Sequence, residues 1–349
     1  MRAEHPSPLC AAPWVAMEFD PFGNVQACCA NALHPLGNIT RERLPEIWHG
    51  PRADALREAL AAGDLTRGCD ICRHRLHHPG GEIPLEYYNQ FARPGAPTTW
   101  PRLLSFSLHN TCNLACVMCG ADLSSKIRST RSDLPPLPHV YGDEFFEDLV
   151  PFLVACEAID FAGGEPFLVR EHRRVWELLA ELGVRPTTSV TTNGTVWNDH
   201  VEWVLDTFSP NICVSVDAMD PTTFEAVRVG ARFDEVMANI ERFEQQAEAT
   251  GSGVYLSFSM TRHNWSELAP VLRFADEHGM DVSIQTVVEP AHGVQHLPVE
   301  ELREVVATME RQEVDLLAHL DRNHDGWLRQ LARLRAEVDE RADGRARPW

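Results

Sequence analysis

The central part of the chain alternates between two hydrophobic periodicities. Segments in which every second residue is apolar predict strands, and segments whose apolar residues recur every three or four positions predict amphipathic helices. The predicted strands are 102–108, 157–162, 186–192, 211–217, 253–261 and 281–287. The predicted helices are 142–155, 169–182, 198–207, 232–249 and 265–278, with further helical pattern over 298–339. Alternating strands and helices form a parallel sheet, so we expect an α/β fold, a partial (β/α)6 TIM-like barrel.

The N-terminal region has a different pattern. Strand-like residues 14–19, a turn and a returning strand at 25–27 predict a hairpin. Proline at the start and glycine at the end delimit a helix within 51–63. Residues 79–101 are rich in proline and glycine, which is typical of a linker. We therefore expect a small N-terminal domain at 1–78, a linker at 79–101, the barrel at 102–290 and a C-terminal helical cap at 291–349.

The predicted barrel strands separate a polar face from an apolar one. The polar face carries mostly hydroxyl groups, including Ser105, Ser107, Thr187, Ser189, Thr191, Cys213, Ser215, Asp217, Ser257 and Ser259. Helices cover the outer face of such a sheet, so the polar set is expected to line the cavity. Buried hydroxyls need water or a polar ligand. This predicts a sugar-like, hydroxyl-rich substrate. The alternative is a water-filled channel that has no preference for sugars.

Composition narrows the partners and the compartment. The 51 acidic residues exceed the 31 basic ones, giving a net charge of −20, so neither nucleic acid nor an anionic membrane is an expected partner. The sequence shows neither a signal peptide nor an apolar run of membrane-spanning length, which predicts a cytoplasmic protein. In a reducing compartment, ten cysteines favour metal ligation or catalysis over disulfides.

Three cysteines, Cys112, Cys116 and Cys119, follow the first predicted barrel strand within eight residues. They suit three corners of a 4Fe–4S cluster, and the absence of a fourth cysteine nearby leaves one iron open for a chelating ligand. The tetrapeptide Gly163-Gly164-Glu165-Pro166 ends the next predicted strand. This Cys-x3-Cys-x2-Cys spacing followed by Gly-Gly-Glu-Pro resembles the radical S-adenosylmethionine (SAM) superfamily, in which the open iron binds the amino and carboxylate groups of SAM.

The resemblance implies roles for residues near this iron. Met118 stands at the position that lies beside adenine in the superfamily. Glu165, with the backbone of Gly163 and Gly164, is expected to bind the SAM amino group. The alternative for the tetrapeptide is a tight turn with a surface carboxylate.

Further residues on the barrel strands resemble the SAM site of the superfamily. Ser215 and Arg228 resemble a Ser and an Arg that bind the SAM carboxylate, for which the guanidinium fork is suited. Asn193 is expected to contact the ribose. For Arg228, a surface ion pair is the alternative.

A second set of cysteines precedes the barrel: Cys10, Cys28, Cys69 and Cys72. Four thiolates would ligate a cluster fully. Their spacing resembles the twitch half of the SPASM module, which binds one auxiliary 4Fe–4S cluster. A four-cysteine zinc site is the alternative. Neighbouring residues on a strand point to opposite faces, so only one of Cys28 and Cys29 is expected to ligate, and the spacing favours Cys28.

Cys213 decides the expected reaction. It lies on the polar face of its strand with no cysteine neighbour, in a segment, Asn211-Ile212-Cys213-Val214-Ser215, that resembles radical SAM sugar epimerases of orthosomycin (avilamycin) antibiotic biosynthesis. The resemblance implies that a 5′-deoxyadenosyl radical removes hydrogen from one face of a carbon and that Cys213 returns hydrogen from the other. A buried structural thiol is the alternative.

The combined prediction is a radical SAM epimerase that inverts a carbon stereocentre of a sugar moiety in an oligosaccharide antibiotic intermediate. Its expected cofactors are SAM and two 4Fe–4S clusters, one of them auxiliary and suited to electron transfer, with an external donor such as flavodoxin or ferredoxin. A radical SAM dehydrogenase that resembles aminocyclitol alcohol oxidases is the runner-up. A peptide maturase is disfavoured, and a non-enzymatic iron–sulfur or zinc protein is the remaining class.

Overall fold

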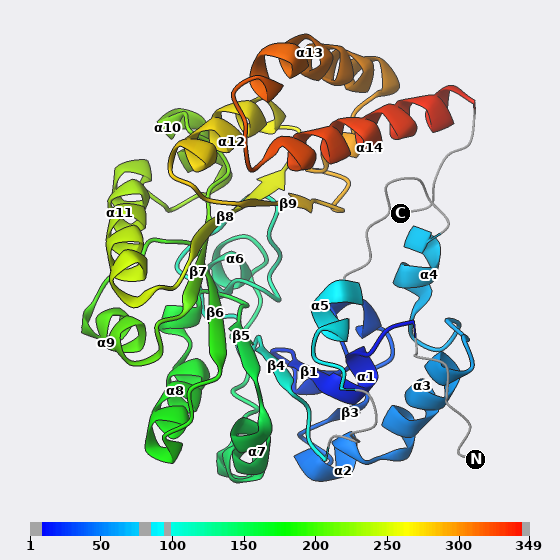
Figure 1. The fold of residues 1–349 in the computed structure, drawn as a ribbon, viewed down its shortest axis with the longest axis vertical. Coiled ribbons are helices and arrows are strands. Elements are labelled where there is room, and N and C mark those ends of the chain that lie inside the picture. The colour runs from blue at the N-terminus through cyan, green and yellow to red at the C-terminus, as the bar shows by residue number, and fades with distance from the viewer. Residues whose placement is uncertain (1–8, 77–84, 94–98, 344–349) are drawn as a thin grey trace. The chain divides into compact units, whose positions relative to one another are not determined.

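A computed structural model describes residues 9–76, 85–93 and 99–343, which fall into two compact units (Figure 1). The first unit comprises residues up to 112 together with 133–190, and the second comprises 113–132 together with residues from 191 onward. In both units parallel strands alternate with helices. The α/β class expected for a partial (β/α)6 barrel is therefore confirmed.

The first unit contains the N-terminal region and the first barrel strands. Its strands are β1 (Ala16–Phe19), β2 (Asn24–Gln26), β3 (Gly37–Asn38), β4 (Leu103–Phe106), β5 (Ala158–Phe161) and β6 (Thr187–Thr192), whose last residues belong to the second unit. Its helices are α1 (Ala12–Val15), α2 (Leu44–Trp48), α3 (Pro51–Ala61), α4 (Asp70–Leu76), α5 (Leu85–Asn89), α7 (Asp143–Ala155) and α8 (Arg170–Leu182). The strands follow the order β3-β2-β1-β4-β5-β6, in which β1, β4, β5 and β6 are parallel.

One face of this sheet is aromatic. Phe19, Phe106 and Phe161 occupy one register on β1, β4 and β5, with ring centroids 5.2 and 5.6 Å apart along the row. Trp176 of α8 packs against Phe161 at 4.6 Å. All four side chains are buried, so helices cover this face. Because successive strand residues point to opposite faces, the polar residues that precede these phenylalanines lie on the other face.

The predicted N-terminal hairpin is confirmed, with β1 antiparallel to β2. Residues 14 and 15 belong to α1, so the strand predicted over 14–19 is wrong at its start; Pro13 in the first turn favours the helix. The predicted helix after Gly50 forms as α3, and Gly63 follows it with a φ of 74°. Proline and glycine signals at helix ends therefore predicted this region more accurately than the alternating pattern over residues 14–19.

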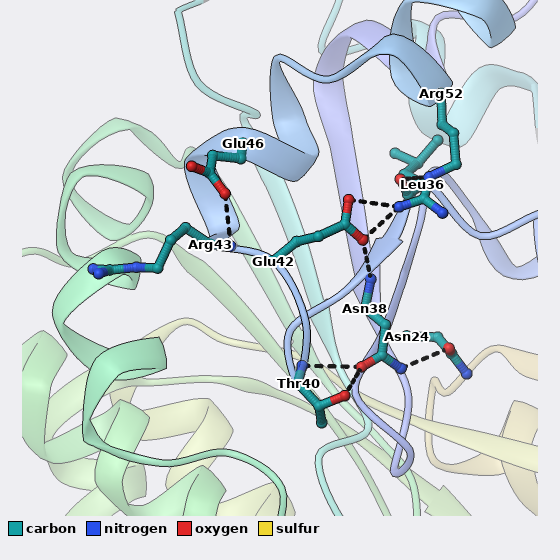
Figure 2. A network of polar contacts seen from close by, with 8 residues as sticks. All are labelled: Asn24, Leu36, Asn38, Thr40, Glu42, Arg43, Glu46 and Arg52. Atoms are coloured by element: carbon teal, nitrogen blue, oxygen red, sulfur yellow. Dashed lines mark hydrogen bonds and ion pairs between the residues drawn. The ribbon is translucent and has the colours of Figure 1, made fainter.

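Figure 2 shows how polar side chains fix the segment after the hairpin. The side-chain amide of Asn38 donates through Nδ2 to Asn24 Oδ1 at 2.9 Å. Glu42 forms an ion pair with Arg52 of α3, whose Nε donates to the carbonyl oxygen of Leu36 at 2.8 Å. These contacts tie β2, β3 and α3 together.

The N-terminal region is hydrogen-bonded to the barrel strands. β1 runs parallel to β4, with Ala16 opposite Leu103 and Phe19 opposite Phe106. Within the expected linker, residues 85–89 form α5, while 79–84 and 94–98 lie outside the described residues. The domain boundaries expected at residues 78, 101 and 290 stay a prediction.

The second unit carries the remaining barrel elements. Its strands β7 (Asn211–Ser215), β8 (Val254–Met260) and β9 (Val282–Thr286) are parallel and adjacent in this order. Its helices are α6 (Ser125–Thr130), α9 (Asp199–Phe208), α10 (Pro221–Val227), α11 (Phe233–Thr250), α12 (Leu268–Glu277), α13 (Val299–Leu317) and α14 (His324–Ala342). The last two lie side by side (Figure 1) and confirm the helical pattern expected after residue 298.

In the second unit, the sequence patterns missed two short helices, α6 and α10. α10 begins after Asp220, whose carboxylate accepts from the amide of Thr223 at 2.7 Å, and Pro221 occupies its first turn. An Asp-Pro start signal was therefore present, but the helix is too short for a periodic pattern. None of the helices in residues 9–76, 85–93 and 99–343 is long and apolar enough to cross a membrane.

Candidate functional site

Backbone hydrogen bonds hold the loop that carries Cys116 and Cys119. The amides of Ala115 and Val117 donate to carbonyl oxygens of segment 227–229 at 2.8 and 2.9 Å. This segment follows α10, so the short helix that the sequence patterns missed supports the cysteine loop. Backbone hydrogen bonds to segment 227–229 therefore hold the cysteine loop in place.

A buried ion pair lies next to these two thiols. Arg228 Nε donates to Asp217 Oδ2 at 2.6 Å, and the two residues are 8% and 0% exposed. The ion pair considered for Arg228 is therefore buried and not on the surface. Burial raises the pKa of Cys116 and of Cys119, and the charge of Arg228 opposes this rise. Thiols in such a position fit a metal cluster, because a bound metal compensates the charge that burial disfavours.

The first cysteine of the motif, Cys112, ends the first unit, next to the glycine pair. Gly163 and Gly164 have φ angles of 74° and 57°. A Cβ on Gly164 would lie 2.3 Å from the carbonyl oxygen of Thr111, and one on Gly163 would lie 2.7 Å from the Cβ of Ser107. Both positions therefore require glycine for close packing against the chain that leads into Cys112.

The carboxylate of Glu165 is fully buried. Its amide donates to the carbonyl oxygen of Thr111 at 2.8 Å, and its Oε1 accepts from the amide of Phe167 at 3.2 Å. The alternative of a turn with a surface carboxylate is therefore wrong. The contact with Phe167 orients the carboxylate, and the expected binding of the SAM amine by Glu165 stays a prediction.

Cys213 is 4% exposed and lies on β7, two residues before Ser215. The pleat of β7 places its thiol on the face that carries Ser215. Burial raises the pKa of Cys213 to about 12, with Thr191 and Arg228 opposing the rise. The thiol is therefore protonated at neutral pH.

Asn193 is bound to the residue that follows Cys112. Its Nδ2 donates to Asn113 Oδ1 at 2.9 Å, and its Oδ1 accepts from the amide of Thr195 at 2.9 Å. These contacts hold the cysteine loop to the end of β6. The ribose contact expected of Asn193 stays a prediction, as does the adenine contact of the half-buried Met118.

The four N-terminal cysteines that the spacing selected line one cavity that opens to solvent, with Leu56 and Leu60 among its other lining residues. They are Cys10, Cys28, Cys69 and Cys72. Cys29 is exposed and does not line this cavity, as the pleat of the strand predicts.

The chemistry of this cavity fits an iron–sulfur cluster. Burial raises the pKa of Cys28, and raises that of Cys69 to about 11 with a further contribution from the charge of Cys72. Across the part of the chain that the structure describes, no three His, Cys, Asp or Glu side chains converge closely enough to hold a single metal ion. Thiols spread around a cavity suit a polynuclear cluster, in which each thiolate binds a different iron, better than one zinc ion.

The sequence analysis placed Ser105 and Ser189 on the polar face but missed two carboxylates that lie in the same row, on the face opposite the aromatic one. Glu18, Ser105, Asp160 and Ser189 are register partners across β1, β4, β5 and β6, and we call them the acidic row. The signal was present, because Glu18 and Asp160 are each carboxylates between apolar neighbours of a predicted strand. Such a residue in a buried strand is expected to face a cavity.

Two tyrosines of α5 contact the acidic row. Tyr88 donates to Glu18 Oε1 at 2.9 Å, and Tyr87 donates to Asp160 Oδ2, which Ser105 also contacts at 3.2 Å. Burial raises the pKa of Glu18 to about 7 and also raises that of Asp160. Neither carboxylate forms an ion pair with a cation in the described segments. The row therefore favours ligand groups that donate hydrogen bonds and disfavours anionic ones.

Comparison with protein families matches two parts of the chain. Residues 10–74 match SPASM, described as an iron–sulfur cluster-binding domain. Residues 106–275 match the radical SAM superfamily. The first match contains the cavity with four cysteines, and the second contains both the three-cysteine motif and the glycine pair.

Curated relatives share one name. A GTP 3′,8-cyclase of Rhizobium etli strain CFN 42 is 30% identical over 222 residues, which cover 60% of this chain and 59% of that protein. A GTP 3′,8-cyclase of Rhizobium etli strain CIAT 652 is 28% identical over 253 residues, 68% of this chain and 67% of that protein. Among solved structures, Streptococcus suis SuiB bound to precursor peptide SuiA is 14% identical with a TM-score of 0.44, over 78% of this chain and 61% of that one. The chain thus spans about 59% of the length of the first relative.

These names contradict the function expected from the sequence. The predictions of a sugar epimerase and of its alternative, a sugar or aminocyclitol dehydrogenase, are wrong, because the relatives are named for a reaction of GTP. The antibiotic substrate and the return of hydrogen by Cys213 in epimerisation fall with them. The physical reason is that hydroxyl-lined strands accommodate many polar ligands, so they indicate polarity and not a sugar.

Proposed function

This chain contains a SPASM-type iron–sulfur domain at residues 10–74 and a radical SAM domain at residues 106–275, and from this premise we propose that it starts radical chemistry on a polar small molecule. Its cofactors are SAM and 4Fe–4S clusters, one of them auxiliary. When bound and reduced, the SAM-binding cluster supplies the electron that cleaves SAM to methionine and a 5′-deoxyadenosyl radical. The observation that carries the proposal is the radical SAM match, which contains the motif Cys112, Cys116 and Cys119.

The residues of this chain have distinct tasks in the proposal. Cys112, Cys116 and Cys119 hold the SAM-binding cluster, and the buried Cys116 and half-buried Cys119 fit that role. Glu165, with the backbone of Gly163 and Gly164, binds the SAM amine, and glycine at both positions allows the close backbone packing there.

The SAM carboxylate and ribose have their own proposed contacts. Arg228, with Ser215, is suited to the carboxylate, because Asp217 fixes the Nε edge of the guanidinium and leaves the other nitrogens to a ligand. Asn193 holds the cysteine loop next to the ribose, and Met118 lies beside the adenine.

The auxiliary cluster is assigned to Cys10, Cys28, Cys69 and Cys72. Held by these four thiolates, a cluster would have no open iron and would be suited to electron transfer, not to substrate binding. An external one-electron donor such as flavodoxin or ferredoxin would reduce the protein.

The relatives place GTP first among the substrates to test. The acidic row accommodates the guanine end of this nucleotide better than its phosphates. A carboxyl oxygen accepts N–H groups of guanine, whereas the burial that raises the pKa of Glu18 and of Asp160 also makes the row unfavourable for a charged triphosphate. Cys213 remains a candidate site residue on the polar face, as a protonated thiol beside Thr191.

The test is SAM cleavage by anaerobically reconstituted protein with dithionite, with and without GTP. We expect 5′-deoxyadenosine from the wild type and from Cys29→Ser, and none from Cys116→Ser. Protein that carries both clusters and forms no 5′-deoxyadenosine contradicts the proposed chemistry. Consumption of GTP in step with 5′-deoxyadenosine supports GTP as substrate, and unchanged GTP alongside SAM cleavage rejects it while leaving the radical chemistry intact.

A further inference from the structure

The short helix α6 is bound to the cysteine loop at three consecutive carbonyl groups. Ser124 Oγ donates to the carbonyl oxygen of Leu114 at 2.6 Å. The guanidinium of Arg131 donates to the carbonyl oxygen of Cys116 at 3.0 Å and also to that of Ala115. Two side chains, one at each end of α6, therefore fix the backbone immediately before and at the second cysteine.

Both ends of α6 are themselves held in place. Ser124 is 1% exposed and accepts from the amide of Ile127 at 3.2 Å as the helix cap. The amide of Arg131 donates to the carbonyl oxygen of Ile127 at 2.8 Å. The backbone at Ser124 and Arg131 is therefore already fixed before a cluster binds to the loop. Little conformational freedom of α6 is lost on binding.

The two arginines near the cysteine loop differ in charge balance. Arg131 donates to the carbonyl oxygen of Cys116, and Arg228 lies in segment 227–229, whose carbonyl oxygens accept from the amides of Ala115 and Val117. Asp217 neutralises Arg228 through a contact of 2.6 Å. Arg131 forms no ion pair with any carboxylate in the described ranges of the chain. The uncompensated positive charge at this loop therefore belongs to Arg131.

We propose that Arg131 is a positioning residue for the SAM-binding cluster, which holds the carbonyls of the cysteine loop and makes the bound cluster easier to reduce. The proposal rests on the assignment of Cys112, Cys116 and Cys119 to that cluster. A 4Fe–4S cluster that takes up one electron from an external donor gains one negative charge. A cation hydrogen-bonded to the cysteine loop stabilises the reduced form, and because Arg131 is exposed, its closeness to the loop and not burial carries the effect.

The chain offers a matched set of variants. Arg131→Gln removes the charge and keeps a neutral donor. Arg131→Lys keeps the charge and loses the forked pair of hydrogen bonds. Lys126→Gln removes a charge at another exposed position of the same helix, whereas Arg131 is exposed but hydrogen-bonded to the cysteine loop. The measurements on reconstituted holoenzyme are the reduction potential of the cluster that responds to SAM and the rate of iron loss to a chelator.

For Arg131→Gln we expect the reduction equilibrium of this cluster to become at least tenfold less favourable, which is about 59 mV for one electron, while the auxiliary cluster is unchanged. Lys126→Gln should change the equilibrium by less than about threefold. Arg131→Lys should keep the equilibrium within about threefold of the wild type and lose iron several times faster. Equal potentials for Arg131→Gln and Lys126→Gln overturn the proposal, as does an equal shift in both Arg131 variants.

If Arg131→Gln does not retain iron, the lysine variant decides. A lysine variant with wild-type iron retention overturns the proposal. If the assignment of the SAM-binding cluster to the three-cysteine motif is wrong, Cys116→Ser will leave the cluster that responds to SAM intact. This result differs from every outcome that concerns Arg131 alone. A wild type that cleaves SAM, together with Arg131 variants of unchanged potential and iron retention, rejects only the role of Arg131.

Discussion

Replacement of Gly164 by alanine tests whether the glycine pair and the cysteine motif depend on one another. The new Cβ would lie 2.3 Å from the carbonyl oxygen of Thr111, the residue before Cys112, and the φ of 57° is unfavourable for alanine. Gly183, which ends α8, provides the matched control, because its φ is 68° and a Cβ there meets nothing within 4 Å. Both variants place alanine in a left-handed backbone conformation. Only Gly164→Ala also brings a Cβ into collision with the Thr111 carbonyl oxygen.

The magnitudes follow from this difference. A left-handed conformation costs alanine about 1 kcal/mol relative to glycine at either site. At Gly164, relief of the contact to the 3.0 Å that Cβ atoms tolerate requires a shift of about 0.7 Å in backbone that β4 and the cysteine motif hold on either side. We therefore expect Gly183→Ala to lower the free energy of unfolding by about 1 kcal/mol and Gly164→Ala by about 3 kcal/mol.

The assay is urea unfolding of the metal-free protein, followed by iron content and SAM binding after reconstitution. Gly164→Ala should also load less iron at the three-cysteine motif and bind SAM more weakly, because the displaced backbone leads directly into Cys112. Gly183→Ala should match the wild type in both. Equal unfolding free energies for the two variants, or normal SAM binding by Gly164→Ala, would refute the reasoning.

Three further predictions address other parts of the molecule. Cys28→Ser should lower the iron content from about eight to about four per chain, and Cys29→Ser should not change it, as checked by iron analysis; equal loss in both would contradict the assignment. Asp217→Asn leaves Arg228 buried without its partner and should lower the free energy of unfolding in urea by about 3 to 5 kcal/mol, whereas a double variant with Arg228→Met should lose much less. Burial lowers the pKa of His172 to about 3 from 6.5, so the unfolded state binds more protons and stability is lost as the pH falls from 6.5 towards 3, by up to about 1.4 kcal/mol per pH unit. His172→Gln should flatten this dependence in acid titrations, and an unchanged slope would rule out His172 as its source.

Local pattern predicted the barrel strands and helices because each has a buried face with a regular period. It failed for α6, since six mostly polar residues carry no such period, although Ser124 and Arg131 at its ends hold the cysteine loop. It also failed for the pairing of β1 with β4, because pairing between distant segments leaves no mark in either one.

The candidate site was predictable where spacing carries the chemistry. The pleat and the spacing selected Cys28 over Cys29, and the cavity that the four thiols line agrees with that choice. The substrate class was not predictable, because hydroxyl groups on strands accept sugars, nucleotides and water alike. The acidic row was overlooked since Glu18 and Asp160 come together only through the register of separate strands.

The parallel pairing of β1 with β4 has a consequence for biosynthesis. Ala16 and Leu103 are opposite one another, so 103 − 16 = 87 residues separate the partners. A ribosome that adds about 5 to 20 residues per second makes β1 roughly 4 to 17 seconds before β4. During that interval the nascent strand exposes an unpaired edge, so the first half of the protein completes its fold only after translation has passed into the barrel, and expression of residues 1–78 alone would leave that edge open to aggregation.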